Sequence, residues 1–167
     1  MKERGKNMNI RQIEEKDAKS FLNLLMELDN ETKFMMLEPG ERKNDLYITR
    51  SIIKNNLENS FMYVAEEEKK LVGFLTGERG SANRIKHTAY IVIGILHGHR
   101  GKGIGRKLFE ELEKWAGENN IKRLELTVMT HNEKAVNLYK KMGFKIEGVK
   151  EHSILLDGKL IDEYYMG

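Results

Sequence analysis

The chain has 167 residues, and its 29 lysines and arginines against 26 aspartates and glutamates give a formal net charge of only +3. This length suits one domain, which we expect over residues 1–167 with residues 1–7 frayed. The absence of cysteine excludes disulfides, thiolate zinc sites and a cysteine nucleophile. The longest apolar stretch, residues 91–96, is too short to cross a bilayer, and the polar first residues do not resemble a secretion signal. Composition therefore predicts a soluble, cytoplasmic protein with a mild preference for anionic ligands.

Hydrophobic periodicity and turn residues predict the elements in chain order. The expected strands cover residues 8–13, 61–65, 71–76, 88–96, 123–128, 144–156 and 160–166. The expected helices cover residues 18–28, 46–57, 104–117 and 135–142. Asp17 and Asp45 precede the first two helices and are predicted to cap them. The second helix is predicted to place Ile48, Ile52 and Ile53 on one side.

The connections between these elements define the fold class. The three strands within residues 61–96 follow one another through short loops, so they form an antiparallel meander. The passage from Thr88 to Met129 is a strand–helix–strand crossover, which makes its two strands parallel if they share a sheet. Asp157-Gly158 is a strong signal for a tight hairpin turn. The predicted fold is α+β with a mixed sheet, mostly antiparallel and with one parallel pair in the middle.

The segment most informative about chemistry is a strand, a glycine-rich turn and a helix start within residues 91–106. Gly101, Gly103 and Gly105 remove Cβ atoms and let the backbone direct N–H groups outward. Those groups lie at the positive end of the helix that begins near Ile104, an arrangement that suits a phosphate or pyrophosphate. Three basic side chains add charge around it: Arg100, Lys102 and Arg106. The spacing fits neither the P-loop nor the dinucleotide fingerprint, and the alternative is a turn that only packs a helix against a strand.

This turn resembles the acetyl-CoA motif of the GNAT family of N-acetyltransferases. The motif Q/R-x-x-G-x-G/A is matched by residues 100–105, and a second family pattern, N-x-x-A-x-x-L-Y-x-x-x-G-F, by residues 132–144. The resemblance spans residues 9–166. It implies the acyl-CoA N-acyltransferase fold with about seven strands and four helices, and acetyl-CoA as cosubstrate without a metal. The implied cofactor contacts are Ile93, Gly94, Ile95, Arg100, Gly101, Lys102, Gly103, Ile104, Gly105, Arg106, Asn132 and Tyr139.

Two residues of the second pattern lie about two turns apart on one helix. Asn132 either only caps this helix or also hydrogen-bonds a pantetheine carbonyl. Tyr139 is either a core aromatic beside Phe144 or a general acid, because a phenol matches a departing thiolate in pKa. In the reaction that the resemblance implies, an amine attacks the thioester directly, a backbone N–H of residues 93–95 stabilises the oxyanion, and Tyr139 protonates the sulfur.

The sequence does not assign the general base. Glu78, at the end of the third strand, is the best carboxylate candidate, and a solvated strand-end charge is an equal alternative. His87 and Tyr90 are weaker candidates. Relatives that acetylate ribosomal-protein N-termini carry a glutamate where this chain has Thr127, and relatives with an acid in the fourth strand have it near Tyr90.

Several other features have simpler interpretations. His97 and His99 lack a third ligand and are expected to be surface groups rather than a metal site. Phe34, Met35 and Met36 form one wall of the acceptor pocket in the family, although a core contact is the safer interpretation. The charged segment 66–70 is expected to be a solvated hairpin tip.

The C-terminal stretch resembles the branch that contains bacterial amino-acid and ribosomal-protein alanine N-acetyltransferases. The predicted function is therefore acetyl transfer from acetyl-CoA to a primary amine of a small molecule, amino acid or peptide. The alternative is a non-catalytic acyl-CoA-binding sensor. A nucleic-acid-binding module is disfavoured because basic and acidic residues are interspersed. No membrane partner is expected, and family members commonly dimerise, so a homodimer is expected.

Overall fold

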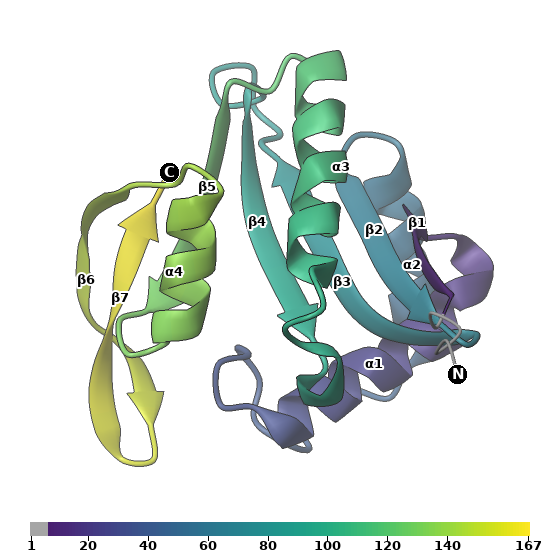
Figure 1. The fold of residues 1–167 in the computed structure, drawn as a ribbon, viewed down its shortest axis with the longest axis horizontal. Coiled ribbons are helices and arrows are strands. Elements are labelled where there is room, and N and C mark those ends of the chain that lie inside the picture. Colours follow the sequence, from purple (N-terminus) through teal and green to yellow (C-terminus); the bar gives the residue numbers. More distant parts are fainter. Residues whose placement is uncertain (1–6) are drawn as a thin grey trace, which may run out of the picture.

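A computed structural model describes residues 7–167, so the expected fraying of residues 1–7 falls almost wholly outside the described residues. Within them, the strands form one seven-stranded sheet in the order β1-β2-β3-β4-β5-β7-β6 (Figure 1). The strands are β1 (Met8–Gln12), β2 (Phe61–Glu67), β3 (Lys70–Arg79), β4 (Thr88–Ile95), β5 (Arg123–Met129), β6 (Ile146–Leu156) and β7 (Lys159–Met166). The helices are α1 (Ala18–Glu31), α2 (Leu46–Leu57), α3 (Ile104–Glu118) and α4 (Glu133–Lys141), with short 3-10 turns η1 (Glu15–Asp17) and η2 (His97–His99).

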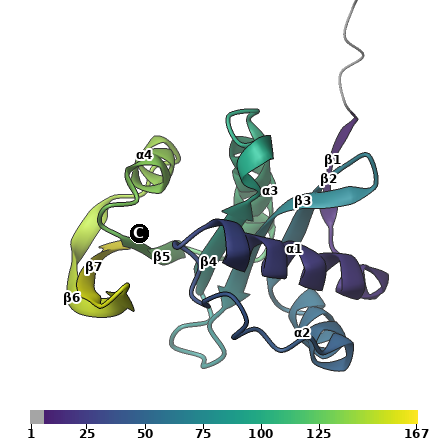
Figure 2. The same ribbon diagram turned by 90° about the horizontal axis from the view of Figure 1, so that it is seen from below.

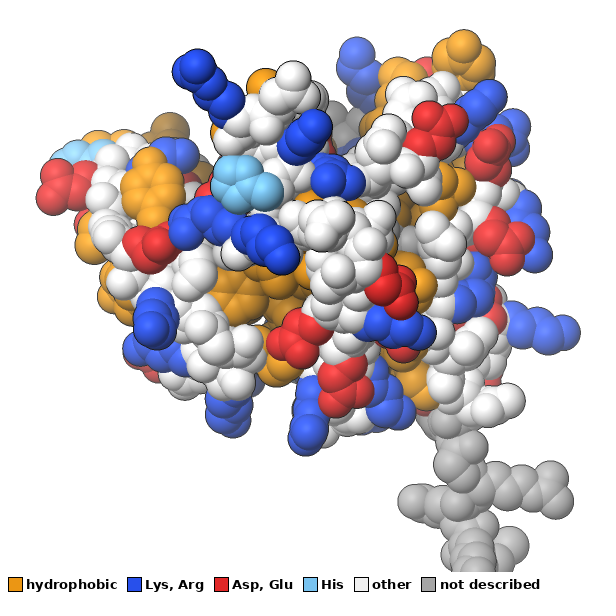
Figure 3. Space-filling model, turned by 90° about the horizontal axis from the view of Figure 1, so that it is seen from above, with side chains coloured by type: hydrophobic (Ala, Val, Ile, Leu, Met, Phe, Trp, Pro, Cys, Tyr) orange, Lys and Arg blue, Asp and Glu red, His pale blue; other side chains and the backbone are white. Residues whose placement is uncertain are grey.

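The sheet topology confirms the predicted fold class. β4 and β5 are the parallel pair, joined by α3 as the crossover, and the other neighbouring strands pair antiparallel. α1 and α2 lie on one face of the sheet, and α3 and α4 lie on the other (Figure 2). No helix within the described residues is long and apolar enough to span a membrane. Basic and acidic side chains are interspersed over the face of the molecule that Figure 3 displays.

Both layers of helices pack on the sheet through close contacts at glycines. α3 buries an apolar stripe that includes Leu108 and Leu112, and a Cβ at Gly77 of β3 would lie 3.2 Å from Leu112. On the opposite face, a Cβ at Gly94 of β4 would lie 2.8 Å from Leu28 of α1 and 2.7 Å from Phe74 of β3. Such distances are shorter than relaxed contacts, so any larger residue at position 94 would displace the side chains of Leu28 and Phe74.

The two predicted helix caps have different outcomes. Asp45 caps α2 as predicted, because its carboxylate accepts a hydrogen bond from the Ile48 N–H at 3.1 Å. Asp17 precedes α1 but does not cap it with its side chain. Its carboxylate instead accepts two hydrogen bonds from the Arg11 guanidinium, at 2.7 and 2.9 Å, and one from the Glu14 N–H at 2.8 Å. A nearby cation and the extra turn η1 therefore outcompete the cap.

The second helix also faces the sheet differently from the prediction. Ile53 is fully buried, as expected, but Ile48 and Ile52 are 41% and 49% exposed. Thr49 takes the second buried position, and its hydroxyl donates to the Asp45 carbonyl oxygen. The exposed isoleucines line a pocket instead of the core.

The Arg11–Asp17 ion pair yields a stability prediction. Hydrogen bonding to Arg11 lowers the pKa of Asp17, so the ionised carboxylate stabilises the folded state at neutral pH, and this contribution disappears as the pH falls through the lowered value. We expect Asp17→Asn to lower the free energy of unfolding by about 2 kcal/mol at pH 7 and by less near pH 3, because the contribution begins to fall below the ordinary carboxyl pKa. Urea denaturation at both pH values measures the difference.

The exposed neighbour Glu15 provides the matched control. Glu15→Gln should leave the free energy of unfolding within about 0.5 kcal/mol of the wild-type value at both pH values. An equal loss for Asp17→Asn at pH 7 and pH 3 would show that the ion pair is not its cause.

Candidate active site

The central feature of the site is a fork between β4 and β5. The two strands pair in parallel only from Thr88 opposite Arg123 to Tyr90 opposite Glu125, although β4 continues to Ile95. Figure 1 shows them close together at the top and diverging toward the end where α3 begins. The inner edge of β4 therefore lacks a strand partner beyond Tyr90, and a large pocket opens in the gap.

The glycine-rich turn lies at the open end of this fork. Gly101 and Gly103 have φ angles of +74° and +77°, the left-handed region that side chains disfavour, and added Cβ atoms would meet no heavy atom within 4 Å. Gly103 is also the N-cap of α3, where it offers no capping side chain to the first-turn N–H groups. Gly105 packs against α4, because a Cβ added at this residue would lie only 3.3 Å from the Leu138 side chain. This uncapped, open turn fits a diphosphate.

The turn is anchored by a residue that the sequence placed at a solvated hairpin tip. Glu67, the last residue of β2, is only 5% exposed. The hairpin turn consists of Glu68 and Lys69 alone, so Glu67 still belongs to the strand and pairs with Lys70. Its carboxylate lies 2.5 Å from His99 Nδ1 and 3.9 Å from Lys102 Nζ. Glu67 Oε2 and His99 Nδ1 are both buried, and neither makes a hydrogen bond of good geometry within the described residues, so this contact joins β2 to the turn by proximity of charge. His97 is exposed, as predicted, whereas His99 is only partly exposed because it contacts Glu67 of the distant β2.

The other cations near the turn are partly engaged. Arg100 donates from Nε to the Ile95 carbonyl at 3.0 Å, so it occupies one of the backbone acceptors on β4. Arg106 pairs with Glu110 one turn along α3, at 3.1 Å. Both side chains line the pocket. Among the described residues, no three histidine, cysteine, aspartate or glutamate side chains come together as a metal site requires.

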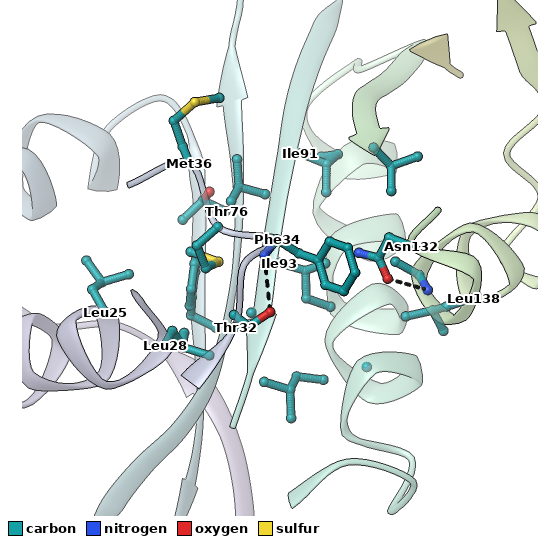
Figure 4. A pocket seen from close by; sticks show the side chains of 18 of the residues that line it. Leu25, Leu28, Thr32, Phe34, Met36, Thr76, Ile91, Ile93, Asn132 and Leu138 are labelled. Carbon is teal, nitrogen blue, oxygen red and sulfur yellow. Dashed lines mark hydrogen bonds between the residues drawn. The ribbon is translucent and has the colours of Figure 1, made fainter. Parts of the chain in front are cut away.

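Asn132 and Tyr139 form the opposite wall of the fork on α4. Asn132 caps α4 by accepting a hydrogen bond from the Ala135 N–H at 3.4 Å, which leaves its amide N–H groups available to a ligand. Figure 4 shows its side chain beside the Phe34 ring. Tyr139 is 8% exposed and packs against Phe109 and Phe144, yet it also lines the pocket. The two alternatives for Tyr139 are thus compatible, since its ring lies in the core and the residue borders the pocket.

Burial sets the protonation state of Tyr139. Desolvation raises the pKa of its phenol well above the ordinary value, and the nearby Tyr90 adds to this shift. The raised pKa favours the protonated hydroxyl at neutral pH. Tyr139 can act as a proton donor but not as a base.

Glu78 and Tyr90 lie on the opposite side of the sheet, toward α1 and α2. They face each other across β3 and β4, and both line the pocket. The Tyr90 hydroxyl lies 2.7 Å from Thr127 Oγ1 on β5. Tyr90 and Thr127, compared above with acidic positions of the family, are thus in contact with each other. His87, the third base candidate, is exposed and lies outside the residues that line the pocket.

The segment between α1 and α2 closes one side of the pocket. Phe34 is 41% exposed, and its ring centre lies 5.2 Å from that of His131, in the loop before α4. Lys33 forms an ion pair with Asp157 at the tip of the β6–β7 hairpin. Figure 4 shows Phe34 between Ile93 of β4 and Asn132. Phe34 and Met36 therefore line the pocket, whereas Met35 also packs against the core.

Two further pocket residues, Glu163 and His131, were not among the residues that the sequence predicted for the site. Glu163 of β7 is only 6% exposed, and its carboxylate accepts a hydrogen bond from the Ser153 hydroxyl at 2.9 Å. It reaches the pocket because β7 pairs with β5, with Glu163 opposite Met129. His131 reaches it as the residue before the α4 cap. Only its position next to Asn132 pointed to the site.

Comparison with known proteins agrees with this geometry. The chain belongs to the acetyltransferase (GNAT) family, whose sequence profile matches residues 22–144. It is 33% identical over 100 residues to the L-amino acid N-acetyltransferase AaaT of Escherichia coli, covering 58% of this chain but only 60% of that protein. It is 29% identical over 157 residues to the spermidine N(1)-acetyltransferase of Vibrio cholerae, covering 93% of this chain and 88% of that protein. A GNAT-family acetyltransferase structure from Streptococcus pneumoniae superposes with a TM-score of 0.91 at 31% identity, covering 96% of this chain and 97% of that one. The predicted family and fold are confirmed.

The left-handed turn yields a prediction on ligand affinity. Gly103→Ala forces a side chain into the conformation at φ +77°, which costs about 1–2 kcal/mol, so the turn should relax and its N–H groups should lose their alignment. We expect the dissociation constant for acetyl-CoA to rise about tenfold, as measured by calorimetry.

Gly117 of α3 is the matched control, because an added Cβ there meets no heavy atom within 4 Å and its φ is not positive. Gly117→Ala should bind acetyl-CoA like the wild type. Unchanged affinity in Gly103→Ala would remove the turn from the binding site.

Proposed function

We propose that this protein is an acetyl-CoA-dependent N-acetyltransferase that acts on a primary amine of a small molecule, amino acid or peptide. One observation carries the proposal. The fork has an open, uncapped glycine turn at one end, and its wall contains a buried phenol whose pKa is raised by desolvation. The relatives support the same class, since those compared above are named as N-acetyltransferases of amino acids and of spermidine.

The cofactor would be held along the inner edge of β4. Amides of residues 101–105 would bind the diphosphate, and the backbone of residues 93–95, free of β5, would pair with the pantetheine arm. Asn132 would donate from its side-chain amide to a pantetheine carbonyl. Acetyl-CoA supplies a thioester, which is an activated acyl group. Arg100 must leave the Ile95 carbonyl if that oxygen is to pair with the ligand.

Tyr139 would act as the general acid. A thiolate leaving group needs a proton, and the raised pKa of this phenol keeps that proton in place until it is needed. A backbone N–H of residues 93–95 would stabilise the negative charge that develops on the carbonyl oxygen. Both groups are fixed by the fold before substrate binds.

The acceptor amine would approach from the side of α1 and α2. Glu78 is our candidate for the base that takes its proton, because it lines the pocket directly opposite Tyr90 and has no ion-pair partner within the described residues. The exposed apolar residues of this side, among them Met36 and Ile52, would contact the rest of the acceptor. We further propose a cytoplasmic location. The expected homodimer stays a prediction.

The activity is tested by thiol release. Acetyl-CoA incubated with panels of amino acids, polyamines, aminoglycosides and N-terminal peptides should give free CoA thiol with at least one amine. We expect Tyr139→Phe to lower kcat with that amine by about 10²–10⁴-fold and to leave the acetyl-CoA dissociation constant within about twofold, since only the proton donor is lost.

Tyr165 of β7 is the control, because it is 46% exposed and lies outside the pocket. Tyr165→Phe should keep full activity. Normal turnover in Tyr139→Phe would refute the acid assignment, and thermal stabilisation by CoA without thiol release from any amine would favour a sensor.

Glu78 is tested by Glu78→Gln, which keeps the size of the side chain and removes its ability to accept a proton. We expect kcat to fall by at least about tenfold with little change in acetyl-CoA affinity. Glu151→Gln on exposed β6 is the matched change outside the pocket and should be silent. A fully active Glu78→Gln would mean that another group or water takes the proton.

A further inference from the structure

The fork ends at an unusual hydrogen bond. If the β4–β5 register continued past Tyr90 opposite Glu125, Val92 would lie opposite Thr127. The Thr127 N–H points toward β4, where a parallel ladder would give it a backbone carbonyl. It instead donates to the side-chain hydroxyl oxygen of Tyr90, at 3.3 Å. A side chain thus takes the place of the next backbone acceptor.

The same hydroxyl makes a second bond to the same residue. Tyr90 Oη lies 2.7 Å from Thr127 Oγ1. A phenol has one proton to donate and can accept at its oxygen, so it can accept from the Thr127 N–H and donate to Thr127 Oγ1 at once. Both bonds tie one side chain of β4 to one residue of β5 at the point where the backbones separate.

We propose that Tyr90 is a positioning residue that stops the pairing of β4 with β5 and so keeps the fork open for acetyl-CoA. An N–H that already has an acceptor gains little from further backbone pairing. The Tyr90 hydroxyl occupies the position in front of the Thr127 N–H that a β4 carbonyl would otherwise take. The strand edge of residues 91–95 therefore remains available to a ligand before the ligand arrives, which is preorganisation.

The position of this pair links it to the chemistry. Tyr90 and Tyr139 both line the pocket that opens in the fork, and Tyr90 is the last residue of β4 that pairs with β5. Glu78 faces Tyr90 from β3. The diphosphate turn lies at the other end, so the acyl end of a bound thioester would point toward Tyr90. The inference rests on the proposed function in this respect, since it takes acetyl-CoA as the ligand of the fork.

Amide exchange and cofactor binding test the inference together. In Tyr90→Phe, the Thr127 N–H loses its acceptor, so hydrogen exchange at the Thr127 amide of the unliganded protein, measured by NMR, should be at least about tenfold faster. The dissociation constant for acetyl-CoA should rise about tenfold, because nothing then holds the unliganded strand edge in one arrangement and the ligand must order it. Thr127→Val removes only the hydroxyl bond, so it should keep the amide of residue 127 protected and bind acetyl-CoA within about threefold of the wild type.

Tyr165→Phe is the matched control, because Tyr165 lies opposite Thr127 on its other neighbour, β7, and is 46% exposed. It should leave both measurements unchanged.

If Tyr90→Phe matches the wild type in exchange or in affinity while remaining folded by thermal melting, the inference is overturned. If Tyr90→Phe does not fold, Thr127→Val decides: loss of protection at residue 127 would show that the side-chain pair does not act as stated. If the wild type binds no acetyl-CoA but exchange accelerates in Tyr90→Phe, the proposed function fails and the assignment of Tyr90 to the strand separation stands.

Discussion

The early end of the β4–β5 ladder is the constraint on which the rest of the structure depends. Backbone N–H and C=O groups need partners, and a strand in the middle of a sheet normally finds them on both sides. β4 finds them on the side of β3 along its whole length, but on the side of β5 only as far as Tyr90. The free edge of residues 91–95 is a row of donors and acceptors at the centre of the protein. Arg100, bonded to the Ile95 carbonyl, meets one of these needs in the unliganded chain.

Different elements approach this gap from the two faces of the sheet. α3 and α4 bring the glycine turn, Asn132 and Tyr139 to one face, and α1, α2 and the ends of β3, β6 and β7 bound the other (Figure 2). Cofactor and acceptor would therefore meet through the fork from opposite sides. Such an arrangement lets a direct transfer proceed without a covalent enzyme intermediate, because neither substrate blocks the other.

The acceptor side carries the features that would set substrate choice. Phe34 against His131, and Lys33 with Asp157, connect the segment after α1 to the other half of the molecule. Buried Glu163 adds a carboxylate beyond β5. These contacts join loops and strand ends, which vary most easily on a fixed scaffold. The fold and the fork accordingly define the reaction class more firmly than they define the amine.

The sequence by itself determined the order of the elements, the mixed sheet, the glycine-rich turn before α3 and the α4 motif. All of these features are local. Helical spacing, strand alternation, turn glycines and the Asn132 cap each depend on a stretch of only a few residues. What only the tertiary structure decided lies between distant segments. Glu67 is buried because β2 ends beside His99, Asp17 binds Arg11 instead of capping α1, and the Tyr90 hydroxyl meets Thr127 across the gap. Each partner is remote in sequence or in competition with a local alternative, so its contact depends on strand order and register, which no short stretch of residues contains.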